Sequence, residues 1–585
     1  MKKDLNKIGR AKDEWQKETV EARLKKYNLN KCPTKFYTPL DVKEFDFLEK
    51  IGFPGQYPYT AGNDPVPRWQ ALAESEAKAS FNFEWGGASS SGAGKYAGFG
   101  TSEDYRDYLL RMHELGRRGG PNFAFDLPTQ CGYDSDNPRA IGEVGRVGVA
   151  IDSFQDFETV YEAYTGELEM DKVASNFTIN APAIVIIAMF AALAEKRGVS
   201  LDKLRGTPQN DILKEYVSRG TYIFPPRPSL RLFRDTLAFC TKHIPKMNVT
   251  SIGGYHMREA GASREQDLAF SMAIGAAYLQ SGIDAGLDID EFAPKFTFNA
   301  FGGSMEMYEE IAFQRAARRM WATMLKERFG AKNSKSMMIR QIMTAHIGCS
   351  STTLQRPLNN LCRTIVGGVA GGMSGGVPFA AMPPYDEPLG LGHSLEAQQL
   401  GHDATRILIY EARLGEVTDP WAGSYFMESL TDRIEASAME EFEKIEKMGG
   451  AVAAIENGYI QREIAKSAYA RQKKIETQEQ FVVGVNCFNG ANEINVMTER
   501  SVPDVYSSEL MNTAENRQKE SLSKLKNERD NKAVSEALKE LTAAAKKSED
   551  NLMPVVIKCV KTYATLQEIC DVFRDVLGEA EPSTI

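Results

Sequence analysis

The most constraining feature of the sequence is an alternation of short apolar runs and long helical stretches between Tyr96 and Tyr425. Strand-like runs occur at 123–127, 176–179, 250–253 and 295–298, and a longer stretch of helical character follows each of them. Alternating strands and helices form parallel sheets that are covered by helices, so the pattern predicts a parallel α/β fold. The length of this region fits an eight-stranded (β/α)8 TIM barrel, which is the fold that we expect.

The regions on either side of the alternation have a different character. Residues 1–95 begin with a charged helical segment and continue into a stretch rich in Pro, Gly and aromatic residues, which is typical of an arm wrapped over a globular body. Residues 436–585 show the pattern of amphipathic helices with mixed acidic and basic residues. We therefore expect an N-terminal helix and wrapping arm at 1–95, the barrel at 96–435 and a helical C-terminal extension or connector at 436–585.

Composition excludes several classes of function. The formal net charge of −9 leaves no basic surplus with which a general nucleic-acid-binding protein neutralises phosphates. The longest apolar run, 181–194, is too short to span a bilayer and predicts a buried element. The N-terminus is charged and carries no secretory signal, and the eight cysteines form no CxxC pair, as expected for reduced thiols. We expect a cytoplasmic protein that binds neither nucleic acid nor membrane.

Common catalytic motifs are missing from the sequence. It contains no P-loop, no GxSxG and no HExxH, and its six histidines show no metal-ligand spacing, so no metal site is predicted within this chain. Polar residues nevertheless follow two predicted strands directly, in YHMREAG after VTSIGG and in DLPTQCGYDSD after FAF. The carboxyl ends of barrel strands are where such folds place their chemistry.

Seven long strings resemble the methylmalonyl-CoA mutase family and occur in the order in which that family has them. They are YAGFGTSEDY (96–105), FDLPTQCGYDSDNPRAIGEVGRVGVAIDS (125–153), RGTPQNDILKEYVSRGTYIFPPRPSLR (205–231), GGYHMREAGAS (253–263), FAPKFTFNAF (292–301), RAARRMWA (315–322) and DPWAGSYFMESLT (419–431). The similarity extends from Tyr37 to Cys559, about nine-tenths of the chain.

The resemblance implies a barrel that threads an acyl-CoA along its axis and a flavodoxin-like cobalamin domain, either fused downstream or supplied by a separate chain. In that domain the histidine of DxHxxG ligates cobalt, and this sequence ends where the domain would begin. The HxxG at His113 has Arg111 in place of the aspartate and lies in an early helix, so we expect His113 at the surface.

These observations predict a large, substrate-binding subunit that lacks the fused B12 domain. The expected cofactor is adenosylcobalamin, with its cobalt ligated by a small flavodoxin-like partner that carries DxHxxG. A heterodimer or heterotetramer is expected, with a G-protein chaperone as a further candidate partner.

Four residues match the family's catalytic positions. The resemblance implies that His256 hydrogen-bonds the migrating thioester carbonyl and that Gln209 is a second polar group facing the substrate. It also implies that Arg219 holds a free carboxylate and that Tyr96 is wedged between cofactor and substrate. Without the motif, each residue has a structural explanation: a packed imidazole, a helix cap, an exposed arginine or a packed aromatic ring.

Further residues are expected around the same cavity. Tyr255, His346 and Lys95 are predicted to contact the substrate together with Arg219, and Gln130 and Glu387 are predicted to contact the cofactor together with Tyr96. His346 is equally compatible with burial as a packed neutral side chain.

The sequence departs from the family in its binding segments. Gly94 replaces an arginine of the CoA-gripping arm, and Lys95 could supply part of that charge. The segment with His346 is longer than in the family, and small and apolar residues replace the polar ones that precede Glu387. Loss of polar groups enlarges and dries a cavity, which favours a bulkier apolar substituent on the substrate.

The predicted function is a radical 1,2-carbon-skeleton rearrangement of a branched acyl-CoA that carries a second carboxylate. The substrate would be of the methylmalonyl-CoA/succinyl-CoA type or a bulkier alkyl- or aryl-substituted analogue. Two alternatives stay open: a catalytically silent structural subunit of a mutase heterodimer, and a mutase for a monocarboxylic or hydroxyacyl-CoA.

Overall fold

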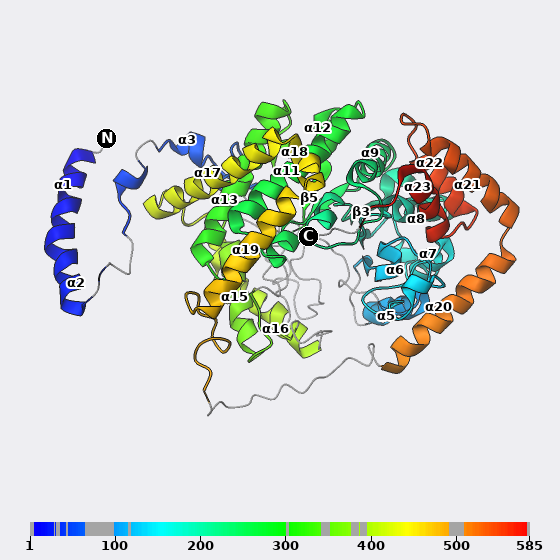
Figure 1. The fold of residues 1–585 in the computed structure, drawn as a ribbon, viewed down its shortest axis with the longest axis horizontal. Coiled ribbons are helices and arrows are strands. Elements are labelled where there is room, and N and C mark those ends of the chain that lie inside the picture. Colours follow the sequence, from blue (N-terminus) through cyan, green and yellow to red (C-terminus); the bar gives the residue numbers. More distant parts are fainter. Residues whose placement is uncertain are drawn as a thin grey trace.

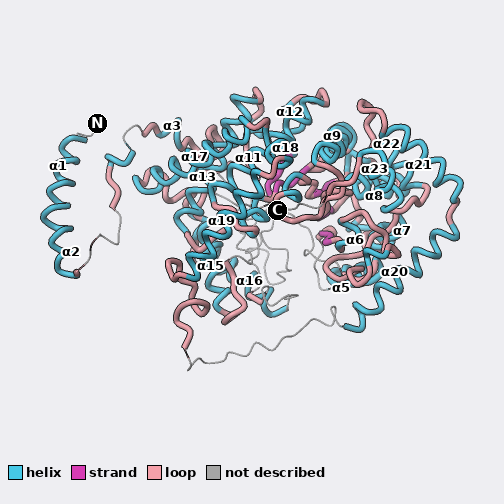
Figure 2. Tube along the Cα trace, in the orientation of Figure 1, coloured by secondary structure: helices cyan, strands magenta, loops and turns pink. Residues whose placement is uncertain are grey.

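A computed structural model of the chain shows a mostly helical α/β protein with a few short strands near its centre (Figure 1, Figure 2). The structure describes residues 5–28, 30, 36–42, 45–64, 99–114, 119–299, 303–340, 351–375, 385–386, 395–490 and 508–581.

The strands of the described residues form two parallel sheets. β1 (Asn122–Ala124), β2 (Ala174–Thr178) and β3 (Arg205–Pro208) pair in the order β1-β2-β3, and β4 (Thr250–Ile252) pairs with β5 (Phe296–Phe298).

Backbone hydrogen bonds join the two sheets. The N–H of Asn248 donates to the carbonyl of Gly206 at 2.9 Å, and the N–H of Ser251 donates to that of Gln209 at 2.8 Å. The five strands therefore lie side by side in chain order, and the carboxyl ends of neighbouring strands meet at one edge.

The predicted parallel α/β fold is confirmed, because the four expected strands coincide with β1, β2, β4 and β5. The strand β3 was missed, since its sequence Arg-Gly-Thr-Pro contains two residues that disfavour strands. Residues 206 and 208 face the same neighbouring strand, and the carbonyl of Gly206 bonds to the segment that leads into β4. Pro208 has no N–H to donate on that side, so the hydrogen-bond ladder between β3 and β4 is interrupted there. A closed eight-stranded barrel is not formed by the described residues.

The helices account for most of the chain. Their bounds are α1 Leu5–Trp15, α2 Glu21–Tyr27, α3 Phe47–Lys50, α5 Ser102–Glu114, α6 Leu127–Gln130, α7 Phe154–Tyr161, α8 Ala183–Lys196, α9 Pro226–His243, α10 Gly254–Glu259, α11 Arg264–Asp284, α12 Ile289–Phe292, α13 Met307–Thr323, α14 Ser334–Met337, α15 Asn359–Gly372, α16 Leu395–Arg406, α17 Tyr425–Lys447, α18 Gly450–Glu456, α19 Tyr459–Glu476, α20 Ser508–Glu528, α21 Asn531–Ala545, α22 Met553–Lys561 and α23 Leu566–Leu577.

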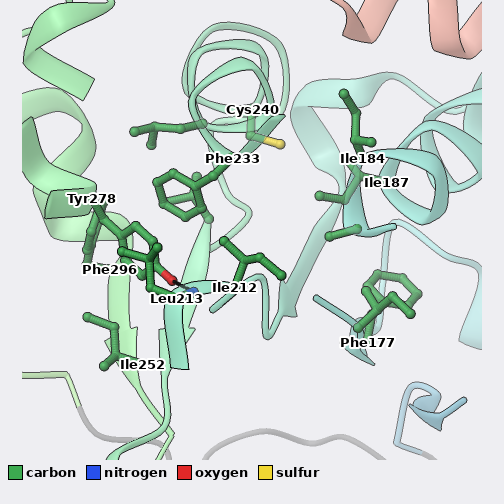
Figure 3. Packing of buried hydrophobic residues seen from close by; sticks show 14 of the residues in the cluster. Phe177, Ile184, Ile187, Ile212, Leu213, Phe233, Cys240, Ile252, Tyr278 and Phe296 are labelled. Carbon is green, nitrogen blue, oxygen red and sulfur yellow. Dashed lines mark hydrogen bonds between the residues drawn. The ribbon is translucent and has the colours of Figure 1, made fainter. Parts of the chain in front are cut away.

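The main hydrophobic core lies between the strands and the helices α8, α9 and α11 (Figure 3). The apolar run that was predicted to be buried is confirmed as such, because every residue from Ala183 to Ala194 of α8 is buried. Figure 3 shows Ile184 and Ile187 of α8 above Phe177 of β2, with Phe233 of α9 beside them. Each large apolar side chain buried in this way stabilises the fold by about 1.5–3 kcal/mol.

The C-terminal helices pack on this body. In Figure 1, α20 to α23 lie beside α7 and α8, and α22 packs directly against α8. Gln518 of α20 donates to Asp152 and to Asp156, both at 2.9 Å. At the opposite edge, α1 and α2 lie apart from the main body, and α1 contains no buried residue (Figure 1).

The expectation for His113 was only half right. His113 lies in the early helix α5 as predicted, but it is half-buried and its ring packs edge-on against Tyr164 with 5.1 Å between ring centroids. None of the described helices has both the length and the apolar composition required to cross a membrane.

Candidate active site

Polar side chains gather at the edge where β1 to β4 end. Gln130 follows β1 in the short helix α6, Asn180 follows β2, Gln209 follows β3 directly, and His256 lies in α10 just after β4. Each of four consecutive parallel strands is therefore followed by a polar side chain at the same edge of the fold. In parallel α/β proteins this edge is where ligands bind.

Gln209 is buried and held by two donors. The side-chain Nδ2 of Asn180 lies 2.8 Å from Gln209 Oε1, and Lys214 Nζ lies 2.7 Å from the same oxygen. The backbone of Gln209 is also anchored on both sides, since its N–H donates to Phe177 of β2 and its carbonyl accepts from Ser251 of β4. Its amide is thus fixed by the body of the fold.

Glu215 is the centre of a buried charge cluster. The side chains of Lys214 and Glu215 form an ion pair in which both are fully buried, and Arg219 Nη1 lies 3.6 Å from Glu215 Oε1. The backbone N–H and the hydroxyl of Thr221 donate to Glu215 Oε2 at 3.0 and 2.6 Å. Two cations therefore share one carboxylate.

The electrostatics of the cluster follow from burial and from these charges. Burial lowers the pKa of Lys214, although the charge of Glu215 opposes that shift. Burial alone would raise the pKa of Glu215, but the charges of Lys214 and Arg219 outweigh it and hold this pKa below its usual value. Glu215 is consequently ionised at neutral pH.

Arg219 is the member of the cluster that reaches solvent. Its side chain is 24% exposed, and its buried Nη1 makes no hydrogen bond within the described residues. Lys214 lies closer to Glu215 than Arg219 does, so the guanidinium keeps N–H donors that Glu215 does not use. Such a group suits a carboxylate ligand, which it can bind through two parallel hydrogen bonds.

Asp211 ties the ends of β3 and β4 together. It accepts from the hydroxyl of Tyr278 and from the N–H of Gly253, both at 2.8 Å, while Tyr278 itself accepts from Leu213 N at 2.8 Å (Figure 3). Burial raises the pKa of Asp211 to about 6. The aspartate thereby positions the start of α10, the helix that carries His256.

His256 and its neighbour Tyr255 are half-buried and lie against each other, with 3.9 Å between ring centroids. Two glycines allow this placement. A Cβ on Gly253 would lie 3.1 Å from His256 Nδ1, and one on Gly254 would lie 2.1 Å from Asp267 Oδ1 of α11. The imidazole therefore sits close to the backbone, on a helix that is pressed against α11.

Gln130 is buried at the end of β1. Its Nε2 donates to the carbonyl of Phe125 at 2.6 Å, whereas its buried Oε1 accepts no hydrogen bond from the described residues. Asp126 caps the helix that carries Gln130, since it accepts from the N–H groups of Thr129 and Gly145 at 2.9 and 2.8 Å. Burial raises the pKa of Asp126 to about 7.

Five of the predicted site residues are thus described, and all five lie at the same edge: Gln130, Gln209, Arg219, Tyr255 and His256. The other four, Lys95, Tyr96, His346 and Glu387, lie outside the described residues.

The prediction from sequence missed the residues that hold this site, namely Asn180, Asp211, Lys214 and Glu215. One signal was present, because the run NDILKE places three charged residues within six positions directly after a strand.

The arrangement defines an α/β protein whose candidate site is built by the segments that follow parallel strands. The chain matches the family described as methylmalonyl-CoA mutase over residues 92–579. It is 38% identical to human mitochondrial methylmalonyl-CoA mutase over 488 residues, which are 83% of this chain and 62% of that protein. The methylmalonyl-CoA mutase of Escherichia coli is 38% identical over 82% of this chain and 64% of its own length.

A third relative matches over nearly its whole length. The 2-hydroxyisobutanoyl-CoA mutase large subunit of Aquincola tertiaricarbonis is 35% identical over 97% of this chain and 96% of its own length. The chain therefore belongs to the methylmalonyl-CoA mutase family, and it spans about 62% of the length of the mitochondrial relatives.

Proposed function

We propose that this chain is the large, substrate-binding subunit of an adenosylcobalamin-dependent acyl-CoA mutase. It would catalyse the 1,2-rearrangement of a branched acyl-CoA that carries a second carboxylate, and the described parallel strands would be part of a (β/α)8 barrel. Membership of the mutase family supports this proposal. The nearly full-length match to a protein named as a mutase large subunit supports a division of labour between two subunits.

The observation that carries the choice of substrate is the partly exposed guanidinium of Arg219, whose Nη1 makes no hydrogen bond within the described residues. Two cations share Glu215, so the guanidinium remains able to bind a further anion at the edge where β1 to β4 end. A dicarboxylic acyl group brings a carboxylate to this position, and the fork of an arginine matches its two oxygens.

The other residues of the site suit the thioester end of the same substrate. We propose that Gln209 and His256 donate hydrogen bonds to the thioester carbonyl, because both lie at the ends of adjacent strands and neither needs to change its charge to do so. Tyr255, and Lys95 and His346 on the basis of the family resemblance, would line the acyl and CoA path. The protein would orient the substrate and exclude water from it.

One described residue, Gln130, supports a contact with the cofactor. Gln130 presents a buried amide oxygen without a hydrogen-bond donor among the described residues, and the amide side chains of a corrin are donors of the required kind. Tyr96 and Glu387 are proposed contacts on the resemblance alone. Adenosylcobalamin, when bound, supplies an organic radical by homolysis of its cobalt–carbon bond.

We propose that the cobalt is ligated by a small, flavodoxin-like B12-binding subunit that carries DxHxxG. The complex would be a heterodimer or a heterotetramer, with a G-protein chaperone as an additional partner. The supporting observation is that the Aquincola relative is named as a large subunit, which implies a companion small subunit for that protein.

The Aquincola relative favours a second candidate substrate, a hydroxyacyl-CoA, since that protein is named as a 2-hydroxyisobutanoyl-CoA mutase. The substrate of this candidate has no free carboxylate for the guanidinium of Arg219 to bind. A catalytically silent subunit is the third candidate, and it would need neither Arg219 nor the network around Gln209.

The test is a substrate screen with the reconstituted complex. The chain is purified with its small partner and adenosylcobalamin, and acyl-CoAs are added one at a time while the absorbance is followed. Cob(II)alamin is expected to appear with a dicarboxylic thioester only. If no acyl thioester produces it in a complex that binds the cofactor, the proposed function is wrong.

A variant pair identifies the role of Arg219. Arg219→Gln is expected to abolish turnover of the dicarboxylic thioester, whereas Arg227→Gln is expected to leave it unchanged, because Arg227 is an exposed residue paired with Glu456. Full activity of Arg219→Gln would remove the argument for a carboxylate.

A further inference from the structure

The orientation of the Gln209 amide decides what this residue offers to a ligand. A carboxamide has an acceptor oxygen on one branch and a donor NH2 on the other, and the two branches are nearly equal in shape. Shape alone therefore does not decide between the two orientations of the amide, and the choice depends on the hydrogen-bond partners of each branch.

The first partner is Asn180, whose own orientation is set by the backbone. The N–H of Asp211 donates to Asn180 Oδ1 at 2.9 Å, which requires an acceptor at that branch. The other branch of Asn180 must therefore be the NH2 group, and it lies 2.8 Å from Gln209 and 2.7 Å from Glu215. Asn180 can present only a donor to Gln209.

The second partner is Lys214, which is a donor in any orientation. An ammonium group has three N–H bonds and no acceptor, and Nζ lies 2.7 Å from the same atom of Gln209. Two donors thus converge on one branch of the Gln209 amide. Reversing the amide would place its NH2 group against both donors and would break both hydrogen bonds.

Lys214 is not needed merely to neutralise Glu215. Glu215 also accepts from Asn180 and from both donors of Thr221, and Arg219 lies within ion-pair distance of it. Besides its charge interactions with Glu215 and Asp211, Lys214 makes a hydrogen bond to Gln209 from a fully buried ammonium group.

We propose that Lys214 is a positioning residue, which locks Gln209 so that its Nε2 donor is turned toward the thioester carbonyl of the substrate. This inference rests on the proposed function, because it takes Gln209 to face an acyl thioester. Lys214 itself does not touch the substrate. It acts on the reaction only through the amide of Gln209, which then supplies a fixed N–H donor as charge develops on the carbonyl oxygen.

The test is a double-mutant cycle on the reconstituted complex, with Lys214→Met, Gln209→Ala and the double variant assayed on the acyl-CoA that the screen identifies. Each single variant is expected to lower kcat by about 100-fold, as for removal of one oriented donor, with little change in KM. The double variant is expected to be no slower than Gln209→Ala, since the proposal gives Lys214 no effect on kcat except through Gln209. If the two losses multiply instead, the proposal is wrong.

A matched control variant and a second background distinguish an effect on catalysis from an effect on folding. Lys295 is a partly buried lysine, which donates to a backbone carbonyl remote from the site, and Lys295→Met is expected to keep the wild-type kcat. If Lys214→Met does not fold, the effect of Gln209→Ala is measured in the Lys214→Met/Glu215→Gln background, where both charges of the buried pair are removed together. A further loss of about 100-fold from Gln209→Ala in that background overturns the proposal.

The two proposals fail in different ways. A wild-type complex that turns over an acyl thioester, together with losses that multiply, removes the role of Lys214 and leaves the mutase function intact. A wild-type complex that processes no acyl thioester removes the proposed function, and the role of Lys214 is lost with it.

Discussion

Glu215 shows how a single side chain can hold a site together without contacting a ligand. It accepts hydrogen bonds on both oxygens and neutralises Lys214, while its charge keeps Arg219 in place. Buried ion pairs of this type add little stability relative to an apolar core, but removal of one partner leaves a buried charge without compensation. Replacing Glu215 alone is therefore expected to lower the stability by much more than the intact ion pair raises it relative to an apolar core.

This asymmetry leads to a prediction for Glu215→Gln. The variant leaves Lys214 and Arg219 as two like charges without the carboxylate that they share, and we expect a loss of stability of about 3–5 kcal/mol. Thermal unfolding followed by circular dichroism measures the effect. Glu456→Gln, which removes the carboxylate of a largely exposed pair with Arg227, is the control and should cost about 0–1 kcal/mol. Equal melting temperatures for the two variants would contradict the central role of Glu215.

Individual residues were predictable from the sequence where a motif identified them. Gln209, Arg219 and His256 were found in this way, and the structure places them at one edge. Asn180 was not found, because its importance depends on a contact with Gln209 across 29 positions of the chain, and Lys214 was not found, because the charged run NDILKE does not show that its lysine bonds to Gln209. Tertiary hydrogen bonds, unlike periodicity, leave no signature in a single sequence.

At the scale of elements, the short strands were easier to predict than the sheet that they form. Apolar runs identified β1, β2, β4 and β5, whereas β3 was hidden by its glycine and its proline. The break in the ladder beside Pro208 could not be inferred, because it depends on which side of the strand the missing N–H faces. The long apolar helix α8 was predictable as a buried element, since it is hydrophobic on all of its faces.

The packing of α10 on α11 gives a prediction at this scale. A methyl group at Gly254 would lie 2.1 Å from Asp267 Oδ1 and 2.6 Å from Ser271 Oγ, so in Gly254→Ala these two side chains or α10 itself must shift. We expect a stability loss of about 1–3 kcal/mol, typical of overpacking, and a lower kcat because His256 moves with its helix. Gly9→Ala is the control, since a methyl group there meets no atom within 4 Å. Unchanged kcat in Gly254→Ala would show that the position of α10 does not matter.

The contact between α20 and the α/β body contains a group of buried carboxylates. Asp152 and Asp156 share Gln518 of α20, and Asp134 lies 3.2 Å from Lys526 of the same helix. Burial raises the pKa of Asp152 well above its usual value, and the charges of Asp134 and Asp156 raise it further. Burial also raises the pKa of Asp134, to about 6.

The sign of the resulting pH dependence follows from linkage. A carboxyl whose pKa is higher in the folded state stabilises the fold when it is protonated. Its contribution to the free energy of unfolding is complete below the unfolded pKa of 3.8 and is lost as the pH rises through about 6 and above. The melting temperature should therefore fall between about pH 5 and pH 8. Asp152→Asn should reduce the fall of the melting temperature. Asp136→Asn should not, because Asp136 is an exposed aspartate, paired with Lys526. A slope that is equal in all three proteins would contradict the assignment.

At the scale of the whole molecule, the two ends of the chain differ in what they bury. The helices α22 and α23 place several apolar side chains in the main core, including Met553, Val556, Val560, Leu566, Ile569 and Phe573. At about 1.5–3 kcal/mol for each large side chain, their burial is worth on the order of 10 kcal/mol, which equals the net stability of a typical protein. By contrast, α1 has no buried residue, and its Lys12 makes only a partly exposed ion pair with Asp41.

Two truncations test this difference. Removal of residues 508–585 exposes the apolar face of α8 that α22 covers, and we expect a protein that aggregates or fails to show a cooperative thermal transition. Removal of residues 1–28 is expected to leave the melting temperature nearly unchanged, because the segment contributes little apolar burial. Size-exclusion chromatography and thermal unfolding of both proteins provide the comparison. If the protein without residues 508–585 is monomeric and melts at the wild-type temperature, the C-terminal helices are not part of the core and the packing of α22 on α8 contributes no stability.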